Sequence, residues 1–596
     1  MQVRRIDIEN FRGIQLLSWA IPADQTFIAL IGPGDSTKST VLTAIHRALT
    51  DAWNITFYDT DFFDCNIEEP IRIRVAVGGL TDDLMSMDVF GLHLCGITAA
   101  GQLTHDPEDA DEPCVVVELT VEKDLEPRWT AYRPGASGEP HALKASLRAR
   151  FGVFRIDERI DAHLRWSRTS ALGRLTEARH GTNQTLAEAS RAAREAVSAS
   201  VSEELTALTS EIQAKLQESG SGDFHDLKPG LDTSLNYAQG NLALFEGQVP
   251  LMNFGLGSRR LAGAATQQLA YDGKALLLVD EVEHGLEPHR LVHLLAQLRR
   301  PQAYAQVFVT THSPTALLHL DAKELTTTRS SGGITTLKRL DGPAEMQRLL
   351  RAWPEAFLAR HIVIAEGKTE YGISLHLLET WDRRRAEQQK SPSSALGVVA
   401  VEGRGGNEAV KLAELLLNAG FRVTLFADSD VEDVNRKATT VAAAGGAVVQ
   451  WAGGLNTEQA VCSELAPAGL TALIDLAIKV AEDPEAAAIA YADHLKDRGA
   501  PRIDTVLSVT SWQEVGINVD RAQEIVAAAA HAKSWFKNVD RGRQLGAFLL
   551  MSLELEGCPL RLALAQLEAA VYAPALALST GPALTRDTTA DSGSQL

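Results

Sequence analysis

Apolar residues along this chain recur in short continuous runs that end in polar or acidic residues. The clearest run is Leu276–Glu281, LLLVDE, in which four apolar residues lead directly into Asp280 and Glu281. Such a run is typical of a buried parallel strand whose carboxyl end carries chemistry. Similar runs, Thr26–Ile31 and Gln306–Thr311, lie before and after it. The pattern therefore predicts an α/β fold in which polar side chains gather at the strand ends.

A glycine-containing loop joins the first of these runs to a helix predicted over Thr40–Leu49. Backbone N–H groups at a helix start can cradle phosphates, Lys38 can reach the β and γ oxygens, and Ser39 can join a Mg²⁺ shell. The usual pattern, GxxxxGK[ST], has a second glycine where this chain has Thr37. The residues expected to bind nucleotide here are Gly32, Gly34, Asp35, Ser36, Thr37, Lys38, Ser39 and Thr40.

The chain after this loop alternates strand-like runs with polar loops up to about residue 154, which predicts an antiparallel lobe. A helical segment follows, with apolar residues at helical spacing. This seam suits a helix pair or short coiled coil, and equally one face of an ordinary packed helix. Its members are Val197, Val201, Leu205, Leu208, Ile212 and Leu216.

Two further segments have the features of a phosphate site. Gly255–Ser258 opens a helix, where backbone N–H groups and the helix dipole favour an anion. His312 follows the apolar run Gln306–Thr311 and can touch a γ-phosphate from a strand end, although a lone histidine is more often structural.

The order of these motifs resembles the ATP-binding-cassette ATPases of chromosome-maintenance and double-strand-break-repair proteins. The resemblance implies a dimer in which ATP lies between two heads. It assigns Lys38 and Ser39 to phosphate and Mg²⁺, Asp280 to Mg²⁺, Glu281 to the hydrolytic base and His312 to the switch histidine. It also implies that Ser258 reaches the γ-phosphate held by the other subunit, although the signature departs from LSGGQ, and that Arg12 lies near the nucleotide.

A second set of acids follows in the C-terminal part. Glu366 ends an apolar run, Glu370 lies one helical turn later, and Asp428 and Asp430 follow the run Arg422–Ala427. Strand ends of a doubly wound sheet bring carboxylates together, and hard cations prefer their oxygens. Two such metals could hold the attacking water and the leaving oxygen of a phosphodiester. The alternative is that these acids are solvated loop residues.

This second pattern resembles the Toprim fold of topoisomerases, primases and certain nucleases, without a tyrosine domain or a zinc module. An ATPase head followed by a Toprim domain resembles the OLD (overcoming lysogenization defect) family of ATP-dependent nucleases, over roughly residues 1–550. The resemblance implies cutting or nicking of DNA with Mg²⁺ or Mn²⁺, dimerisation through the ATPase part, and phage defence. It also implies one further acid, which Glu458 fits, and a lysine. Lys537 is preferred to Lys533 because it follows the aromatic pair Trp535-Phe536.

The length of 596 residues corresponds to several domains. We expect an ATPase N-terminal lobe over 1–165, a helical insertion and dimerisation arm over 166–235, and an ATPase C-terminal lobe over 236–350. A Toprim core over 355–465, its helical part over 466–578 and a disordered tail over 579–596 complete the prediction.

Composition narrows the functional classes. No apolar run approaches the length of a membrane helix, and five scattered cysteines fit a reducing cytoplasm better than a zinc site or disulfides. A net charge of −20 confines any nucleic-acid contact to a local patch.

The leading interpretation is an ATP-regulated, metal-dependent DNA endonuclease in phage defence or DNA repair. It would form a homodimer or higher homo-oligomer, and the need for an accessory defence protein stays open. One alternative is a triggered effector that cuts RNA, because a two-metal site does not read the sugar. The other is a repair-type ATPase that binds DNA without cutting, against which the intact acids Glu366, Glu370, Asp428 and Asp430 argue.

Overall fold

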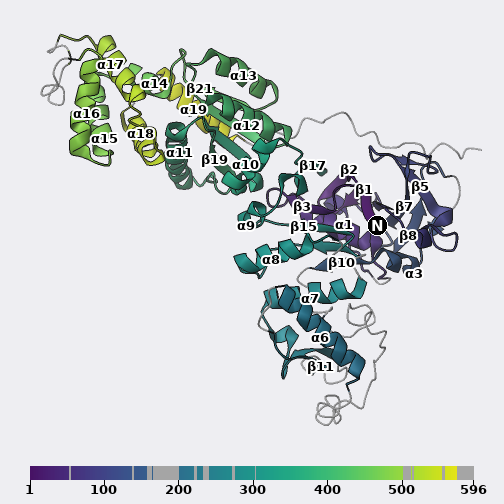
Figure 1. Cartoon of the computed structure of the whole chain (residues 1–596). Coiled ribbons are helices and arrows are strands. Elements are labelled where there is room, and N and C mark those ends of the chain that lie inside the picture. The colour runs from purple at the N-terminus through teal and green to yellow at the C-terminus, as the bar shows by residue number, and fades with distance from the viewer. Residues whose placement is uncertain are drawn as a thin grey trace, which may run out of the picture.

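The computed structural model describes most of the chain in two units, seen side by side in Figure 1. The described residues are 1–52, 55–136, 140–156, 164, 201–219, 224–232, 241–271, 275–301, 304–500, 512, 516–552 and 557–573. The predicted tail, 579–596, lies outside them. The predicted α/β class is confirmed, because both units are built on β-sheets covered by helices.

The N-terminal unit is organised around one large sheet whose main path runs β10-β14-β15-β3-β16-β17-β2-β1-β4-β7-β5-β6. The first five strands are parallel to one another, and every position of β3, β14 and β15 is buried. Three of the five, β3, β14 and β15, correspond to the continuous apolar runs of the sequence. Their bounds are β10 Val153–Ile156, β14 Leu276–Val279, β15 Gln306–Thr310, β3 Phe27–Ile31 and β16 Leu325–Ser331.

The rest of this sheet is antiparallel apart from one pair, since β17 runs parallel to β2. Strand β1 alternates buried and half-buried positions along most of its length, as expected for a strand with one face in the core. The strands at the start of this part are β17 Ile334–Arg339, β2 Ile14–Ala20 and β1 Gln2–Phe11. The antiparallel lobe that the sequence predicts follows, with β4 Ile71–Gly78, β7 Glu112–Val121, β5 Leu94–Ile97, β6 Leu103–Thr104, β8 Pro127–Tyr132 and β9 His141–Ala142.

Helix α6, Glu203–Glu218, and one strand of a small three-stranded sheet are the described elements of the segment expected as a helical insertion over 166–235. The segment is not wholly helical, because β11, Leu227–Asp232, pairs with β12, Asn241–Glu246, and β12 with β13, Val249–Pro250. In the apolar seam, Ile212 and Leu216 are fully buried in the core of the same chain, and Leu205 and Leu208 pack against it. The described part of the seam is therefore used within the chain; Val197 lies outside the described residues.

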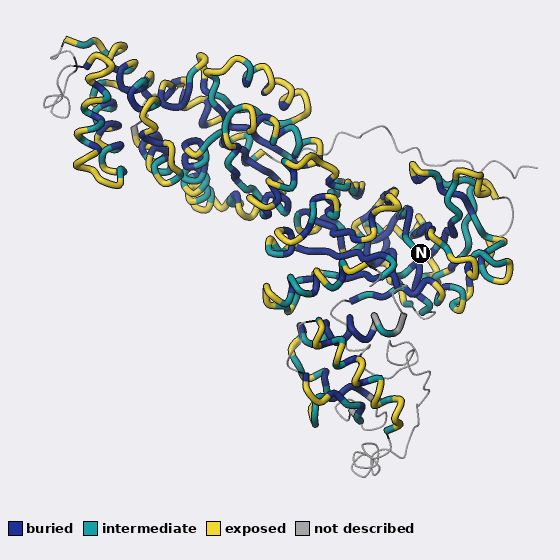
Figure 2. Tube along the Cα trace, viewed as in Figure 1, coloured by how far each residue is buried: buried dark blue, intermediate teal, exposed yellow. Residues whose placement is uncertain are grey.

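The helices of the N-terminal unit cover the parallel strands. They are α1 Lys38–Leu49, α7 Leu256–Tyr271, α8 Pro288–Leu298 and α9 Pro314–Leu318, and α10, Ala344–Ala352, leads to the second unit. Figure 2 shows the strands of the large sheet as a buried interior beneath half-exposed helices.

The C-terminal unit contains a four-stranded parallel sheet in the order β19-β18-β20-β21. Its central strand β18 is paired on both sides, with Ala365 opposite Glu402 on β19 and Phe426 on β20, so the carboxyl ends of these strands meet at one edge. The strands are β18 His361–Ala365, β19 Val398–Glu402, β20 Arg422–Ala427 and β21 Ala447–Gln450. The helices are α11 Lys368–Glu387, α12 Gly406–Asn418, α13 Glu432–Ala443, α14 Thr457–Ser463, α15 Pro467–Lys479, α16 Pro484–Asp497, α17 Val519–Ala532, α18 Val539–Ser552 and α19 Pro559–Tyr572.

The two units share apolar contacts. Phe357, between α10 and β18, packs edge-on against Phe421 at the start of β20, with 5.7 Å between ring centroids. One hydrophobic cluster joins buried residues of both units. Among the described residues, no helix combines the length and apolarity needed to cross a bilayer.

Candidate functional site

The phosphate loop lies between β3 and α1 in a strained backbone conformation. Gly32 has a φ of 142°, and a Cβ there would come within 2.5 Å of the Thr328 carbonyl oxygen, so the position requires glycine. Thr37, where the usual pattern has its second glycine, has a φ of 67° and ψ of 11°. The chain therefore adopts at Thr37 the left-handed conformation that glycine would adopt more easily.

Lys38 is buried inside this loop. Its Nζ donates to the carbonyl oxygens of Gly32 (3.0 Å) and Pro33 (2.8 Å) and to Ser36 Oγ (3.1 Å). Burial and the charge of Arg329 lower the pKa of Lys38 to about 8. A phosphate in the loop would supply the negative charge that its surroundings only partly provide. The other loop residues named from the sequence, Gly34, Asp35 and Thr40, are exposed or half-buried around it.

Asp280, just after β14, is held by side chains from three other elements. Its Oδ1 accepts from Ser39 Oγ on α1 and from Thr310 Oγ1 on β15, both at 2.8 Å. Its Oδ2 accepts from Arg155 Nη2 on β10, also at 2.8 Å. The structure thus brings together Ser39 and Asp280, as predicted. Arg155 was missed, because nothing in its sequence context indicates a contact so far along the chain.

Glu281 has a φ of 47°, and two groups fix this turn. Its N–H donates to Thr310 Oγ1 (2.7 Å), and its carbonyl accepts from Arg260 (2.8 Å), which also donates to the carbonyls of Asp280 (2.5 Å) and His284 (3.0 Å). The exposed Glu281 carboxylate lies 3.2 Å from His284 Nδ1. The sequence analysis also missed Arg260. Its position two residues after Ser258, on a helix that begins at a phosphate motif, could have indicated that it is a site residue.

His312 lies beyond the end of β15, as predicted, and is exposed. Its N–H donates to Glu283 Oε1 at 2.6 Å, and Thr311 Oγ1 donates to the other oxygen of the same carboxylate at 2.7 Å. Burial and the charge of Lys38 lower the pKa of His312. Glu283, rather than Glu281, therefore anchors this switch segment.

Ser258 and Arg12 lie at the margins of the site. Ser258 is in the first turn of α7, where a Cβ on neighbouring Gly257 would clash with the Gly285 carbonyl at 2.1 Å. Arg12, with a φ of 51°, donates from Nε to Asp61 Oδ1 at 2.8 Å. Burial opposes ionisation of Asp61, but the hydrogen bond of Arg12 and the charge of Arg47 hold its pKa below the ordinary value.

The second set of acids meets at the edge of the four-stranded sheet. Glu366 directly follows β18, and its Oε2 accepts from the Asp428 N–H at 2.8 Å. Glu370, in the first turn of α11, is buried, and its Oε2 accepts from the Gly367 N–H at 3.0 Å. Glu458, in the first turn of α14, is buried as well. Asp430 is exposed, and its charge acts on Glu366.

The hydroxyl of Thr457 connects two of these carboxyls. Thr457 Oγ1 accepts from Trp451 Nε1 (2.7 Å) and lies 2.7 Å from Glu370 Oε1 and 2.9 Å from Asp428 Oδ1. A hydroxyl has one proton to donate, so full hydrogen bonding of both carboxyls requires that one of them is itself protonated. Burial and the neighbouring acids raise the pKa of Asp428, and burial raises that of Glu370. Thr457 was missed, although it directly precedes Glu458.

Basic groups lie around this cluster. His531 Nδ1 is 3.2 Å from Glu458 Oε2. Burial raises the pKa of Glu366, whereas the charge of Lys537 is among the smaller effects that lower it. Burial and the charge of Lys533 lower the pKa of His494. The loop before Lys537 packs on α11 through a hydrogen bond from Thr369 Oγ1 to the Phe536 carbonyl at 3.1 Å.

No group of three or more His, Cys, Asp or Glu side chains in the described part of the chain is arranged to hold a metal ion as it stands. The donor set nevertheless fits a hard divalent cation, since it consists of carboxylate oxygens. A cation would offset the same crowded charge that now raises their pKa values.

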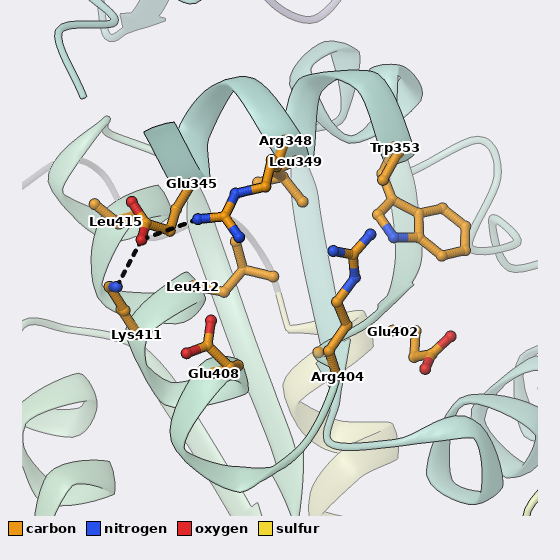
Figure 3. A pocket seen from close by; sticks show the side chains of 12 residues that line it. Glu345, Arg348, Leu349, Trp353, Glu402, Arg404, Glu408, Lys411, Leu412 and Leu415 are labelled. Atoms are coloured by element: carbon orange, nitrogen blue, oxygen red, sulfur yellow. Dashed lines mark hydrogen bonds and ion pairs between the residues drawn. The ribbon is translucent and has the colours of Figure 1, made fainter. Parts of the chain in front are cut away.

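A hollow of about 470 Å³, including its open mouth, lies beside the cluster rather than on it. It is lined by α10 of the first unit and by α12 and the end of β19 of the second. Figure 3 shows Glu345 at its rim, bonded to Arg348 and Lys411, with Trp353 and Arg404 at the opposite side.

Comparison with known proteins identifies the first unit. A family model described as "AAA domain, putative AbiEii toxin, Type IV TA system" matches residues 27–318. This stretch is similar to AAA-type ATPase domains, and it contains the phosphate loop, Asp280 and His312. The match ends before α10, so the four-stranded sheet and its acids lie outside it. No curated protein matches the chain.

Several solved structures are similar to the chain at low identity. The SMC head domain from Thermotoga maritima is 12% identical and covers 57% of this chain and 100% of its own, with a TM-score of 0.29. An SmcHead bound to the C-winged helix domain of ScpA is 15% identical, covering 56% and 97%, with a TM-score of 0.35. An Smc head domain with an extended coiled coil bound to the C-terminal domain of ScpA, derived from Pyrococcus furiosus, is 12% identical, covering 56% and 95%, with a TM-score of 0.33. Values this low do not bear on function.

Proposed function

We propose that the protein is an ATP-regulated, divalent-metal-dependent endonuclease that acts on DNA. One observation carries this proposal: the carboxyl groups of Glu366, Glu370, Asp428 and Glu458 gather at one sheet edge. Buried acids with raised pKa values are a recurring feature of active sites. The Toprim and OLD resemblances of the sequence are in line with it.

Each residue of the cluster has a defined role in this proposal. Glu366, Glu370, Asp428, Asp430 and Glu458 would hold Mg²⁺ or Mn²⁺, which, when bound, supplies an activated water and charge neutralisation at the leaving oxygen. Lys537 would stabilise negative charge on the scissile phosphate. Thr457 would orient Glu370 and Asp428 through its hydroxyl group. His531 would orient the Glu458 carboxylate.

The ATPase domain would control this activity. Lys38, Ser39 and Asp280 would bind ATP and Mg²⁺, with Glu281 as base and His312 as switch. Ser258, at the start of α7, would contact the nucleotide of a second copy, so that ATP binding assembles a homodimer. The geometry of that dimer would decide which nucleic acid reaches the acids. Phage defence in the cytoplasm, with or without an accessory protein, is the role that the family resemblance suggests.

Cleavage of supercoiled plasmid tests the proposal. Wild-type protein is incubated with Mg²⁺ or Mn²⁺, with and without ATP, beside Asp428→Ala and the matched control Asp433→Ala. Asp433 is an exposed acid in the first turn of α13, paired with Arg436 and Lys437, outside the cluster. We expect cutting by wild type and Asp433→Ala, and none by Asp428→Ala.

A second matched pair tests the lysine. Lys537→Ala should lower the cleavage rate by at least about tenfold, since one lost charge stabilisation of about 1.4 kcal/mol has that effect, whereas Lys533→Ala should leave it unchanged. If wild type cuts no plasmid but cuts RNA, the substrate assignment is wrong and the effector alternative stands. Binding of DNA without cleavage of either substrate would favour the repair-type ATPase.

A further inference from the structure

Arg329 lies on β16 at the side of the phosphate loop. Strand β16 pairs in parallel with β3 as far as Thr327, opposite Ile31, and the next carbonyl, that of Thr328, approaches Gly32. Arg329 follows directly. Arg360, just before β18, reaches the same loop, because its Nη2 donates to the Gly34 carbonyl at 3.0 Å. Two arginines thus flank the loop where it faces the C-terminal unit.

The guanidinium of Arg329 is buried without a matching negative charge. It lies over the Phe421 ring, 4.5 Å from the centroid, and its Nη1 donates to the Ala359 carbonyl at 3.3 Å. Its Nε and Nη2 are buried and have no hydrogen-bond partner among the residues that the structure describes. Within the same residues no carboxylate forms an ion pair with it. Burial and the charge of Arg360 lower the pKa of Arg329 to about 10, so it is still cationic at neutral pH.

Such an arrangement costs stability. Each buried unsatisfied donor costs about 1–3 kcal/mol, and an uncompensated buried charge costs more. Proteins keep costly groups where function requires them. The two donors without partners, Nε and Nη2, lie on one edge of the guanidinium, and this edge matches two oxygens of a phosphate. The charge of Arg329 also acts on Lys38, so the arginine and the phosphate-loop lysine lie within electrostatic reach of each other.

We propose that Arg329, with Arg360, binds a phosphate group at the junction between the phosphate loop and the C-terminal unit. This deepens the proposed function, on which it rests for the origin of the phosphate. The group is either the terminal phosphate of bound ATP or a phosphodiester of the nucleic-acid strand. In both cases the two arginines would bind the anion at the start of β18, the strand that leads to Glu366.

The test compares Arg329→Met with Lys338→Met in the full chain. Methionine keeps an apolar side chain over Phe421 and removes the charge and the donors. Lys338 is an exposed cation at the same boundary, where it donates to the Asn418 carbonyl, so its replacement controls for loss of one positive charge. Three probes are titrated against each protein: a fluorescent ATP analogue, the matching ADP analogue and a labelled single-stranded oligonucleotide. Melting temperature is measured without ligand.

If the phosphate belongs to ATP, Arg329→Met lowers the affinity for the ATP analogue by about tenfold or more and leaves the affinity for the ADP analogue unchanged. If it belongs to nucleic acid, both nucleotides bind normally, the oligonucleotide binds more weakly, and the slope of log affinity against log salt falls by about one. In both cases the ligand-free melting temperature rises in Arg329→Met and not in Lys338→Met.

Unchanged affinity for all three probes would overturn the proposal, and so would a lower melting temperature, because it would show that Arg329 is a packing residue. If Arg329→Met does not fold, Arg329→Lys serves instead; it keeps the charge, loses the paired donors, and should weaken the same probe. None of these measurements depends on DNA cleavage, so the test of phosphate binding can still be interpreted if the nuclease proposal fails.

Discussion

Thr37 gives the most direct test of the backbone geometry of the phosphate loop. Its φ of 67° is unfavourable for a β-branched residue. The side chain partly compensates, because Thr37 Oγ1 donates to the Ser36 carbonyl at 2.6 Å and lies 3.1 Å from Thr335 Oγ1. Replacing Thr37 by glycine and by alanine removes the hydroxyl in both cases and leaves the left-handed strain in only one.

The size of the difference follows from two opposing contributions. Left-handed backbone at a residue with a Cβ costs about 1–2 kcal/mol. Glycine avoids this cost but gains about 0.4–1 kcal/mol of freedom in the unfolded chain. The glycine variant should therefore be more stable than the alanine variant by about 0.5–1 kcal/mol. Relative to wild type, alanine should be destabilised by about 1 kcal/mol through loss of the hydroxyl contacts, and glycine should be near neutral.

Scanning calorimetry of the two variants measures this directly. A difference of about 1 kcal/mol corresponds to roughly 2 °C in the midpoint of a domain of this size. The transition of the ATPase domain is identified by its upward shift on adding nucleotide. An alanine variant as stable as the glycine variant would refute the left-handed assignment of Thr37. The glycine variant should also bind nucleotide at least as tightly as wild type.

Two further predictions concern buried polar groups. His361 is buried, with its Nε2 2.8 Å from Thr424 Oγ1, and burial lowers its pKa to about 4. The folded state then binds fewer protons than the unfolded state between about pH 6.5 and 4, so the free energy of unfolding falls as pH drops through this window, by up to about 3 kcal/mol. Urea unfolding of His361→Gln at several pH values should show a smaller decrease than wild type. The prediction is wrong if the free energies of unfolding of the two proteins depend on pH in the same way. Arg260→Met removes the donor to three backbone carbonyls at Asp280, Glu281 and His284, so it should cost about 2–4 kcal/mol and reduce ATP turnover more than nucleotide binding. An unchanged melting temperature would show that these bonds do not hold the turn.

The strands that carry the sites were predictable because buried parallel strands are apolar at every position. Leu276–Val279 and Arg422–Ala427 were found in this way, and Asp280 and Asp428 with them. Strand β16 was not predicted. Its sequence, LTTTRSS, reads as polar, yet its first four residues are buried in the middle of the large sheet, where threonines fill the space between strands. For that reason Arg329 was not considered as a site residue.

The contacts that complete each site were beyond reach of the sequence for a different reason. Arg155 meets Asp280 because β10 and β14 are neighbours in the sheet, and Thr457 meets Glu370 because helices α14 and α11 begin at the same sheet edge. Sequence patterns report which residues share one element, whereas these pairs depend on how elements are ordered in the sheet. The choice of Lys537 over Lys533 rests on the adjacent aromatic residues and stays a prediction.

The central position of β18 has a consequence for hydrogen exchange. All five of its residues are buried, and the strand is paired on both sides, so its amides should become accessible only when the whole C-terminal unit opens. A strand held in this way cannot slide between its neighbours without breaking both ladders. Any effect of nucleotide on the acids should therefore move the sheet as one body, leaving the slow exchange of β18 unchanged. Changes in exchange should appear instead at its two ends, around Arg360 and around Glu366.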